Sequence, residues 1–187
     1  MMELVRRVLL GLFLTACGDG GSSMPDARAD AFVFVDIDAQ VGGGSAELGT
    51  GTTAFEAMVD DQELGLVTGP QGGYHFIVHS RIREMDPGDA VRPGLAENPI
   101  TLFRAFDASG IQIDLMFPPY HIGYEQDDTD PALYVLPSGR ILQIDKTAAE
   151  IDAFYGSRVR LTLRVSDVEG RVATDERWVV AVPYEGP

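Results

Sequence analysis

The chain has 187 residues, with 29 acidic and 14 basic side chains and a formal net charge of −15 at pH 7. Such a charge argues against nucleic acid or anionic lipid as a partner held by bulk electrostatics, and it favours a well-solvated surface or cationic partners. Cys17 is the only cysteine, so an internal disulfide is excluded and apolar packing must stabilise the folded part.

The amino terminus has the order of a secretory signal peptide. Arg6 and Arg7 precede a mostly apolar run from Val8 to Ala16, which is too short for the roughly 20 apolar residues that span a bilayer. The run ends in Leu14-Thr15-Ala16-Cys17, which resembles a bacterial lipobox. This resemblance implies a lipoprotein of the cell envelope, cleaved before Cys17 and acylated there with chains such as palmitate. An ordinary signal peptide with a chance cysteine is the alternative.

The residue after Cys17 is Gly18 rather than the aspartate that favours inner-membrane retention in Gram-negative lipoproteins. The resemblance therefore implies the outer membrane. Residues 17–47 are rich in Gly, Ser and Asp and are typical of a flexible acidic linker. Within them, Phe32-Val33-Phe34-Val35 is either a short docking strand or an apolar part of the spacer. We therefore expect a signal peptide at 1–16, a lipidated linker at 17–47 and one β domain at 48–187.

Short apolar runs with period-two alternation, separated by turn residues, predict strands along the whole of that domain. The expected strands are 55–58, 64–68, 74–85, 100–106, 111–117, 132–136, 140–144, 158–165 and 171–182. Turns at 107–110, 137–139 and 167–170 predict three hairpins. Thr147 and Glu150 have the spacing of a capping box, which predicts one short helix over 147–154 that crosses between sheets.

The strand count predicts an all-β fold, specifically an antiparallel β-sandwich, with an open barrel or a jelly roll as the alternatives. The ending Phe154-x-Gly156-x-x-Val159-x-Leu161-x-Leu163-x-Val165-x-Asp167-x-x-Gly170 resembles the last two strands of bacterial immunoglobulin-like and fibronectin-like modules. The resemblance covers the final 35 residues or so, and it implies an immunoglobulin-like sandwich. No Cys…Trp…Cys framework is present, which excludes an antibody-type domain.

The best candidate for a metal site is the acidic run Glu125, Asp127, Asp128 and Asp130. Calcium takes six to eight oxygen ligands from clustered carboxylates and carbonyls. The run lacks the spacing of a helix-loop-helix calcium site, so a solvated acidic loop is the alternative. Calcium is the one cofactor that the sequence suggests.

Three histidines are present. His75 and His79 share one strand face but lie about 13 Å apart, too far to hold one metal, and His121 lies in another segment. We expect His75 and His79 to be solvent-facing sheet residues next to Arg81 and Arg83. The alternative is that either joins a metal ligand from a neighbouring strand, including His121.

Two further groups of side chains suggest binding surfaces. Arg158, Arg160 and Arg164 form a cationic stripe that either pairs with neighbouring acids such as Asp175 or docks an acidic partner or glycan. A second group could line a carbohydrate platform or cover the edge of the core, and it consists of Tyr120, Tyr124, Tyr134, Tyr155 and His121.

No His-Glu-x-x-His, Cys-x-x-Cys or Gly-x-Ser-x-Gly motif is present, and the glycines at 49–51 lack the strand and helix that a dinucleotide-binding loop requires. We therefore expect a non-enzymatic envelope lipoprotein whose domain has a binding or structural role, with a protein or glycan as partner. The alternatives are a calcium- or glycan-dependent adhesion module and, last, an enzyme.

Overall fold

The computed structural model describes residues 43–70 and 72–186. The chain divides into two units after Ile37, and every described residue belongs to the second, Asp38–Pro187. The described residues are mostly strand with one short helix, which confirms the all-β prediction. Their elements are β1 (Ser45–Thr50), β2 (Glu56–Ala57), β3 (Gln62–Thr68), β4 (Tyr74–Arg83), β5 (Ile100–Asp107), β6 (Tyr120–His121), β7 (Glu125–Gln126), β8 (Leu133–Val135), β9 (Arg140–Ile144), α1 (Ala148–Phe154), β10 (Arg158–Ser166) and β11 (Val172–Pro183).

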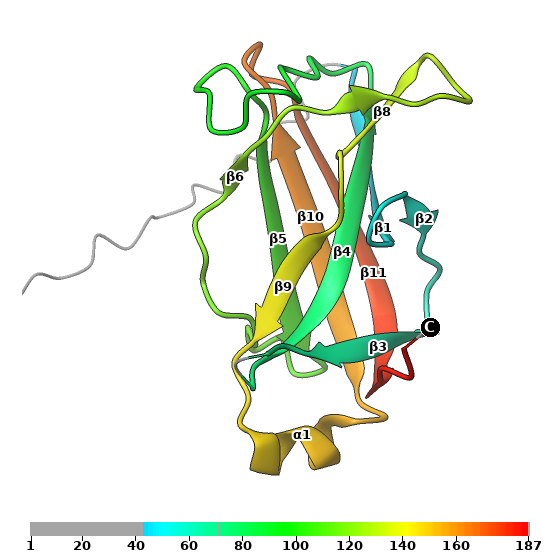
Figure 1. Ribbon diagram of the computed structural model, residues 1–187, viewed down its shortest axis with the longest axis vertical. Helices are drawn as coiled ribbons and strands as arrows, with labels where there is room; N and C mark the ends of the chain where they lie inside the picture. Colours follow the sequence, from blue (N-terminus) through cyan, green and yellow to red (C-terminus); the bar gives the residue numbers. More distant parts are fainter. Residues whose placement is uncertain (1–42, 71, 187) are drawn as a thin grey trace, which may run out of the picture. The chain divides into compact units, whose positions relative to one another are not determined.

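The strands form one curled mixed sheet in which β4 has the most partners (Figure 1). The first half of β4 pairs with β3 and β9, and its second half pairs with β1 and β8, all antiparallel. Beyond β3 the order continues through β11, β10, β5 and β6. The sheet curls so that β1 contacts β10 and β11 without pairing with them.

One strand departs from the predicted antiparallel arrangement. Residues Gln62–Leu66 of β3 pair in parallel with Val179–Pro183 of β11, and only Val67 and Thr68 continue into antiparallel pairing with β4. The prediction of a purely antiparallel sheet is therefore wrong at this position. The physical reason is that β3 changes partner along its length, from β11 to β4. It thereby joins the two parts of the curled sheet.

The carboxy-terminal hairpin is confirmed. β10 and β11 pair without interruption from Arg158 opposite Val180 to Ser166 opposite Val172, and β5 pairs along the other edge of β10. The hairpin turn is closed by the Gly170 N–H, which donates to the Asp167 carbonyl at 3.1 Å. Gly170 has φ of 80°, a left-handed conformation that glycine adopts without a Cβ penalty.

The predicted hairpin between residues 132–136 and 140–144 is wrong. Both strands form, as β8 and β9, but each pairs with β4 and neither pairs with the other. The reason is that β4 is ten residues long and offers one continuous edge to both strands in succession. The Pro137-Ser138-Gly139 segment is a break along that edge instead of a hairpin turn.

The predicted strand at 111–117 is also absent as a regular element. Its residues make two isolated bridges, Gln112 with Phe106 of β5 and Asp114 with Ile144 of β9. The segment therefore bridges β5 and β9, but each contact is a single bridge and the segment forms no continuous ladder with either strand. In addition, β1 begins at Ser45, so residues 45–47 of the predicted linker belong to the domain.

The helix is confirmed as α1, with Thr147 as its N-cap. The Glu150 carboxylate accepts hydrogen bonds from the Thr147 N–H at 2.9 Å and the Thr147 hydroxyl at 2.6 Å. This pairing satisfies a backbone donor that the first turn leaves free. The helix connects β9 to β10 (Figure 1), and its buried residues Ile151 and Phe154 anchor it to the core.

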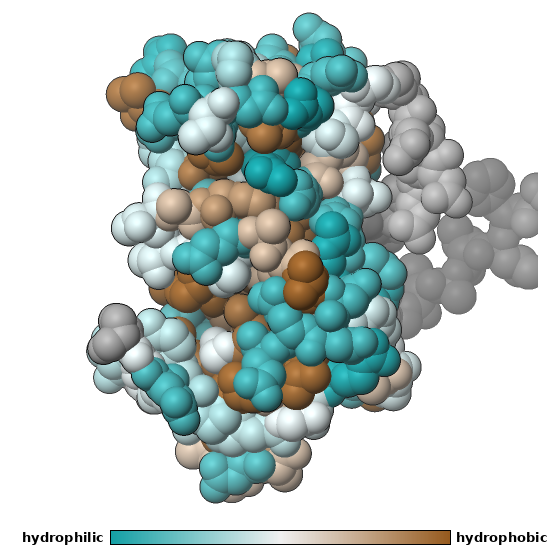
Figure 2. Space-filling view, turned by 90° about the vertical axis from the view of Figure 1, so that its right-hand side faces the viewer, coloured by the Kyte–Doolittle hydropathy of each residue, from teal (hydrophilic) through white to brown (hydrophobic). Residues whose placement is uncertain are grey.

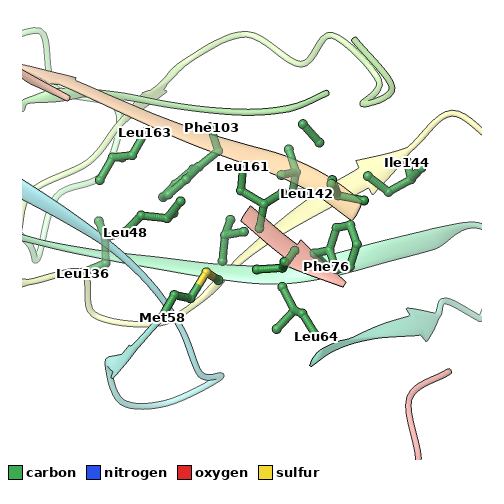
Figure 3. Close-up of a cluster of buried hydrophobic side chains, with 14 of the residues drawn as sticks. Leu48, Met58, Leu64, Phe76, Phe103, Leu136, Leu142, Ile144, Leu161 and Leu163 are labelled. Carbon is green, nitrogen blue, oxygen red and sulfur yellow. The ribbon is translucent and has the colours of Figure 1, made fainter. Parts of the chain in front are cut away.

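The core lies between β4 and the β5–β10–β11 part of the sheet. In Figure 3 the side chains of Phe76 from β4 and Leu161 from β10 fill the space between those two strands. Both are fully buried, as are Val159 and Val165. Burying a large apolar side chain of this kind contributes about 1.5–3 kcal/mol, and it does so here without any disulfide among the described residues.

The two Asp-x-x-Gly hairpin turns predict a difference in stability between otherwise similar variants. The Asp167 side chain is fully buried and accepts from Asp86 N–H, Arg171 N–H and Arg171 Nε at 2.7–2.9 Å, whereas Asp107 caps an exposed turn. We expect Asp167→Ala to lower the free energy of unfolding by about 2–4 kcal/mol, because it orphans buried donors. Asp107→Ala should cost clearly less, and urea denaturation measures both.

The same experiment has a pH signature. Burial alone would raise the pKa of Asp167, but the N–H groups of Asp86 and Arg171 and the Arg171 guanidinium outweigh it, so the pKa of Asp167 is lowered. A carboxylate with a lowered pKa stabilises the fold above its unfolded pKa of about 4, and that contribution is lost as pH falls through the folded value. The difference in free energy of unfolding between wild type and Asp167→Ala should therefore become smaller in acid. An equal cost for both variants would contradict the structural role of Asp167.

Candidate functional site

An open surface pocket of about 380 Å³ lies where the curled sheet has no ladder between β6 and β9. In Figure 1 this region is beside β6, on the left. Its lining comes from three segments distant in sequence, and the residues are Ala90, Pro93, Tyr120, His121, Ile122, Pro137 and Arg140. The pocket thus combines one cation, two aromatic rings and several small apolar surfaces.

One wall of the pocket is the loop between β4 and β5, and the buried side chain of Asn98 fixes its shape. The Asn98 amide oxygen accepts from the Asp89 N–H at 2.7 Å, and its NH₂ group donates to the Arg92 carbonyl at 2.8 Å. Asn98 is 1 % exposed, so these hydrogen bonds are shielded from water. The loop is therefore held in one conformation without regular secondary structure.

The floor of the pocket is β6, which is tied to both neighbouring elements. His121 pairs with Ile100 at the start of β5, and its carbonyl accepts from the Gly94 N–H at 2.8 Å. On the other side, the Tyr120 hydroxyl donates to the Ile141 carbonyl of β9 at 3.3 Å. Although β6 is only two residues long, these contacts hold Tyr120 and His121 in place as lining residues of the pocket.

The opposite wall is the break between β8 and β9. Val135 pairs with Arg81 and Arg140 pairs with Val78, so the four residues 136–139 face only the two residues 79–80 of β4. Four residues thus face two, a mismatch in register of the kind found at a bulge. Gly139 permits this path, because its N–H donates to the Thr52 carbonyl at 2.9 Å and a Cβ would lie 2.2 Å from the Gly51 carbonyl oxygen.

Arg140 differs from almost all other described arginines in its charge environment. Among the ten arginines of residues 43–70 and 72–186, eight form an ion pair with Asp or Glu, namely Arg81, Arg83, Arg92, Arg104, Arg158, Arg160, Arg171 and Arg177. Arg140 and Arg164 form none, and of these two only Arg140 lines the pocket. The acidic surface therefore leaves a cation without a carboxylate at this one concave place.

The guanidinium of Arg140 is partly removed from water. Its Nη1 donates to the Ser138 hydroxyl at 3.1 Å, while its buried Nε has no hydrogen-bond partner among the described residues. Its central carbon lies 5.9 Å from the centre of the Tyr120 ring, at the outer limit of a cation–π contact. Burial lowers the pKa of Arg140, yet a guanidinium stays protonated at any physiological pH.

Asp89, in the loop that lines the pocket, is already paired within that loop. Asp89 accepts from Arg92 Nε at 2.7 Å and from the Val91 N–H at 2.9 Å. The hydrogen bond from Arg92 is the main reason why the pKa of Asp89 is lowered. Because Asp89 is already paired, Arg140 has capacity for an external anion.

The predicted tyrosine platform is only partly assembled. Tyr124 is buried in the core, and its hydroxyl bonds to Ser80 at 2.9 Å and Thr101 at 2.8 Å. Burial raises the pKa of Tyr124 to about 12, so the phenol stays neutral and ties β4 to β5. Tyr120, Tyr134 and Tyr155 are partly buried and pack against the core. Of these three, only Tyr120 also lines the pocket, together with His121.

The expectation that His79 faces solvent is wrong. Its side chain is fully buried, with the Phe55 ring edge-on at 5.8 Å. The break between β8 and β9 explains this position, because the Ser80 N–H finds no strand partner there and donates to His79 Nδ1 at 3.0 Å. Nδ1 must then be the acceptor, which leaves the proton on Nε2, and Nε2 has no partner.

The other two histidines stay apart from His79. His75 is half-buried on β4 opposite Gln143, and burial lowers its pKa. His121 is exposed at the pocket. Across residues 43–70 and 72–186, no His, Cys, Asp and Glu side chains form a group of three or more that could hold a metal ion.

The acidic run proposed for calcium is engaged in local hydrogen bonds. Asp127 accepts from the N–H groups of Thr129 and Asp130 at 2.8 and 3.0 Å, and Asp130 pairs with Arg83. Glu125 belongs to the short strand β7, and Asp128 is in the turn that follows. Asp127 and Asp130 thus hold the loop together, and the geometry adds no support to the calcium hypothesis.

The arginine stripe on β10 mostly forms ion pairs. Arg158 pairs with Asp61 and Arg160 with Glu176, at 2.7 and 3.3 Å. Arg164 has no such partner, and Asp175, expected to pair with the stripe, binds Arg177 on its own strand at 2.6 Å.

Figure 2 shows the face of the molecule at the right of Figure 1, where hydrophilic residues are interrupted by scattered hydrophobic ones.

Cys17, the predicted lipidation site, lies outside the described residues. Within the part of the chain that is described, no helix combines the length and the hydrophobicity needed to cross a bilayer. No protein-family model, curated protein or solved structure matches the chain. The candidate site therefore rests on its own geometry.

His79 predicts acid lability. Burial lowers its pKa, so as pH falls below about 6.5 the unfolded chain takes up the proton before the folded one and stability decreases. We expect the urea midpoint of the wild type to fall between pH 7.5 and pH 5. His79→Phe should be less stable at pH 7.5, because Ser80 N–H loses its acceptor, but its midpoint should change less with pH. Parallel pH dependences would contradict this role.

Calcium should have little effect on the fold. A site whose Kd lies 100-fold below the free calcium concentration would stabilise the protein by about 2.7 kcal/mol. Because Asp127 and Asp130 are already paired, we expect no rise in melting temperature between millimolar calcium and excess chelator. Asp128→Asn should behave like wild type in both conditions. A calcium-dependent rise that Asp128→Asn removes would restore the calcium hypothesis.

Proposed function

We propose that this chain is a bacterial envelope lipoprotein whose all-β domain acts by binding and not by catalysis. The observation that carries the anchoring is the sequence Leu14-Thr15-Ala16-Cys17 after an apolar run. In this proposal residues 1–16 are removed, Cys17 is acylated and a linker presents the domain. Gly18, in place of aspartate, favours the outer membrane.

The proposal includes an immunoglobulin-like arrangement of the domain. It is supported by the uninterrupted β10–β11 hairpin, by the core between β4 and β10, and by the crossing of α1 between the two parts of the sheet. The parallel pairing of β3 with β11 is the departure from a purely antiparallel sandwich.

A binding role is supported by the chemistry of the pocket. Its wall loop is fixed by Asn98 and its floor by β6, so the pocket is preformed, as ligand sites usually are. In residues 43–70 and 72–186, no histidine side chain is hydrogen-bonded to a hydroxyl or a carboxylate. A histidine-activated nucleophile of the triad kind would have such a bond.

Lipidation can be tested directly in a bacterial host. We expect wild-type chain to incorporate an alkyne-tagged palmitate and to fractionate with membranes, and Cys17→Ala to lose both properties. Mass spectrometry of the mature protein should place cleavage before Cys17 with acyl chains on that residue. A mature protein with a free thiol at Cys17, or cleaved elsewhere, would contradict the proposal.

The choice of membrane provides a second readout with a matched variant. Gly18→Asp keeps the lipobox intact, so labelling with palmitate should be unchanged. If the outer-membrane assignment holds, the wild type should sediment with outer-membrane fractions and Gly18→Asp should shift toward the inner membrane. Identical distributions would remove the basis for that assignment while leaving lipidation intact.

A further inference from the structure

We infer that the pocket between β6, the 89–94 loop and the start of β9 binds a small organic carboxylate, with Arg140 as the group that holds its carboxylate. This inference deepens the proposed binding role and rests on it. Three observations carry it, namely the missing counter-charge of Arg140, the preformed walls, and the mixed aromatic and apolar lining.

Arg140 lacks the acidic partner that most described arginines have. In a chain with a net charge of −15, acids outnumber bases two to one, and eight described arginines have acidic partners. Removing a guanidinium from water without a counter-ion is costly. The ring of Tyr120, 5.9 Å away, supplies only a weak attraction. An anion entering the pocket would supply the missing partner.

The planar guanidinium selects the ligand chemistry. Its nitrogen atoms match the two oxygens of a carboxylate in a fork geometry, and charge-assisted hydrogen bonds of this kind are short and strong. Phosphate could also accept from a guanidinium, but the lining holds no second arginine or lysine for its extra charge, and Arg92 in the adjoining loop is bound to Asp89. A monoanionic carboxylate therefore fits the charge of the site better.

The remaining lining indicates the shape of the ligand. Pro93, Pro137 and Ile122 provide apolar surfaces, and Tyr120 provides a ring, all around the guanidinium. Flat or ring-shaped bodies make good contact with such surfaces. We therefore expect a carboxylate on a compact ring, either aromatic or saccharide, in preference to a long flexible acid.

The test is a titration of the ¹⁵N-labelled chain, followed by NMR, with benzoate and glucuronate as the two ring carboxylates. Benzamide serves as the neutral counterpart of benzoate, and inorganic phosphate serves as the alternative anion. We expect saturable shifts of the backbone signals of Gly94, His121 and Ile122 with at least one carboxylate. Benzamide and phosphate should bind at least about tenfold more weakly, because benzamide lacks the negative charge and phosphate lacks the apolar ring.

Arg140→Gln should weaken carboxylate binding about tenfold or more, since it removes the charge and the fork. Arg164→Gln is the matched control, because Arg164 also lacks an acidic partner but lies outside the pocket, and it should bind as wild type does. Arg140→Lys keeps the charge and should bind with intermediate affinity. The dispersion of each spectrum reports whether the variant is folded. If Arg140→Gln does not fold, the inference is judged by the affinity of Arg140→Lys and by the wild-type shifts at the pocket.

Several outcomes would overturn the inference. These are the absence of saturable shifts at the pocket with both carboxylates, equal binding by Arg140→Gln and wild type, equal losses in Arg140→Gln and Arg164→Gln, and tighter binding of phosphate. Each of them leaves the lipidation of Cys17 untouched, since that is read from palmitate labelling. Conversely, a chain without lipid at Cys17 that still binds carboxylate at Arg140 would refute the anchor alone.

Discussion

The structure depends on the way β4 shares its hydrogen-bonding groups among four strands. β4 is ten residues long, longer than any of its partners, so each of its edges is covered by two strands in succession. Wherever one partner ends and the next begins, a backbone group of β4 must be satisfied in another way. At the junction of β8 and β9 the side chain of His79 takes that role by accepting from the Ser80 N–H.

That junction also explains the position of the pocket. The four residues 136–139 face only two residues of β4, and Pro137, within this surplus, lines the pocket. Arg140 follows at once and pairs with Val78, which puts its side chain at the edge of the core, where water is partly excluded. The same local surplus of residues therefore buries a neutral histidine on β4 and leaves a charged arginine beside an open pocket.

The sequence was a good guide where neighbouring residues decide the structure. The alternation in β10 and β11 and the capping box at Thr147 are local patterns, and both predictions are confirmed. It misled where two segments compete for the same partner, as β8 and β9 do for β4, because turn residues at 137–139 fit a hairpin and a break equally well. The parallel pairing of β3 also depends on a strand more than 110 residues away.

The candidate site was even less accessible from sequence, for a related physical reason. The sequence groups Tyr120 and His121 with other tyrosines, but alternation gives no sign that Tyr124 is fully in the core while Tyr120 is partly buried beside the pocket. Arg140 looks like any arginine after a turn. What distinguishes it is the set of acids that have been used elsewhere, above all Asp89 by Arg92, and pairing of that kind is fixed only when the chain is folded. In an acidic protein the informative group is thus an unpaired cation that also lines a pocket, as Arg140 does and Arg164 does not.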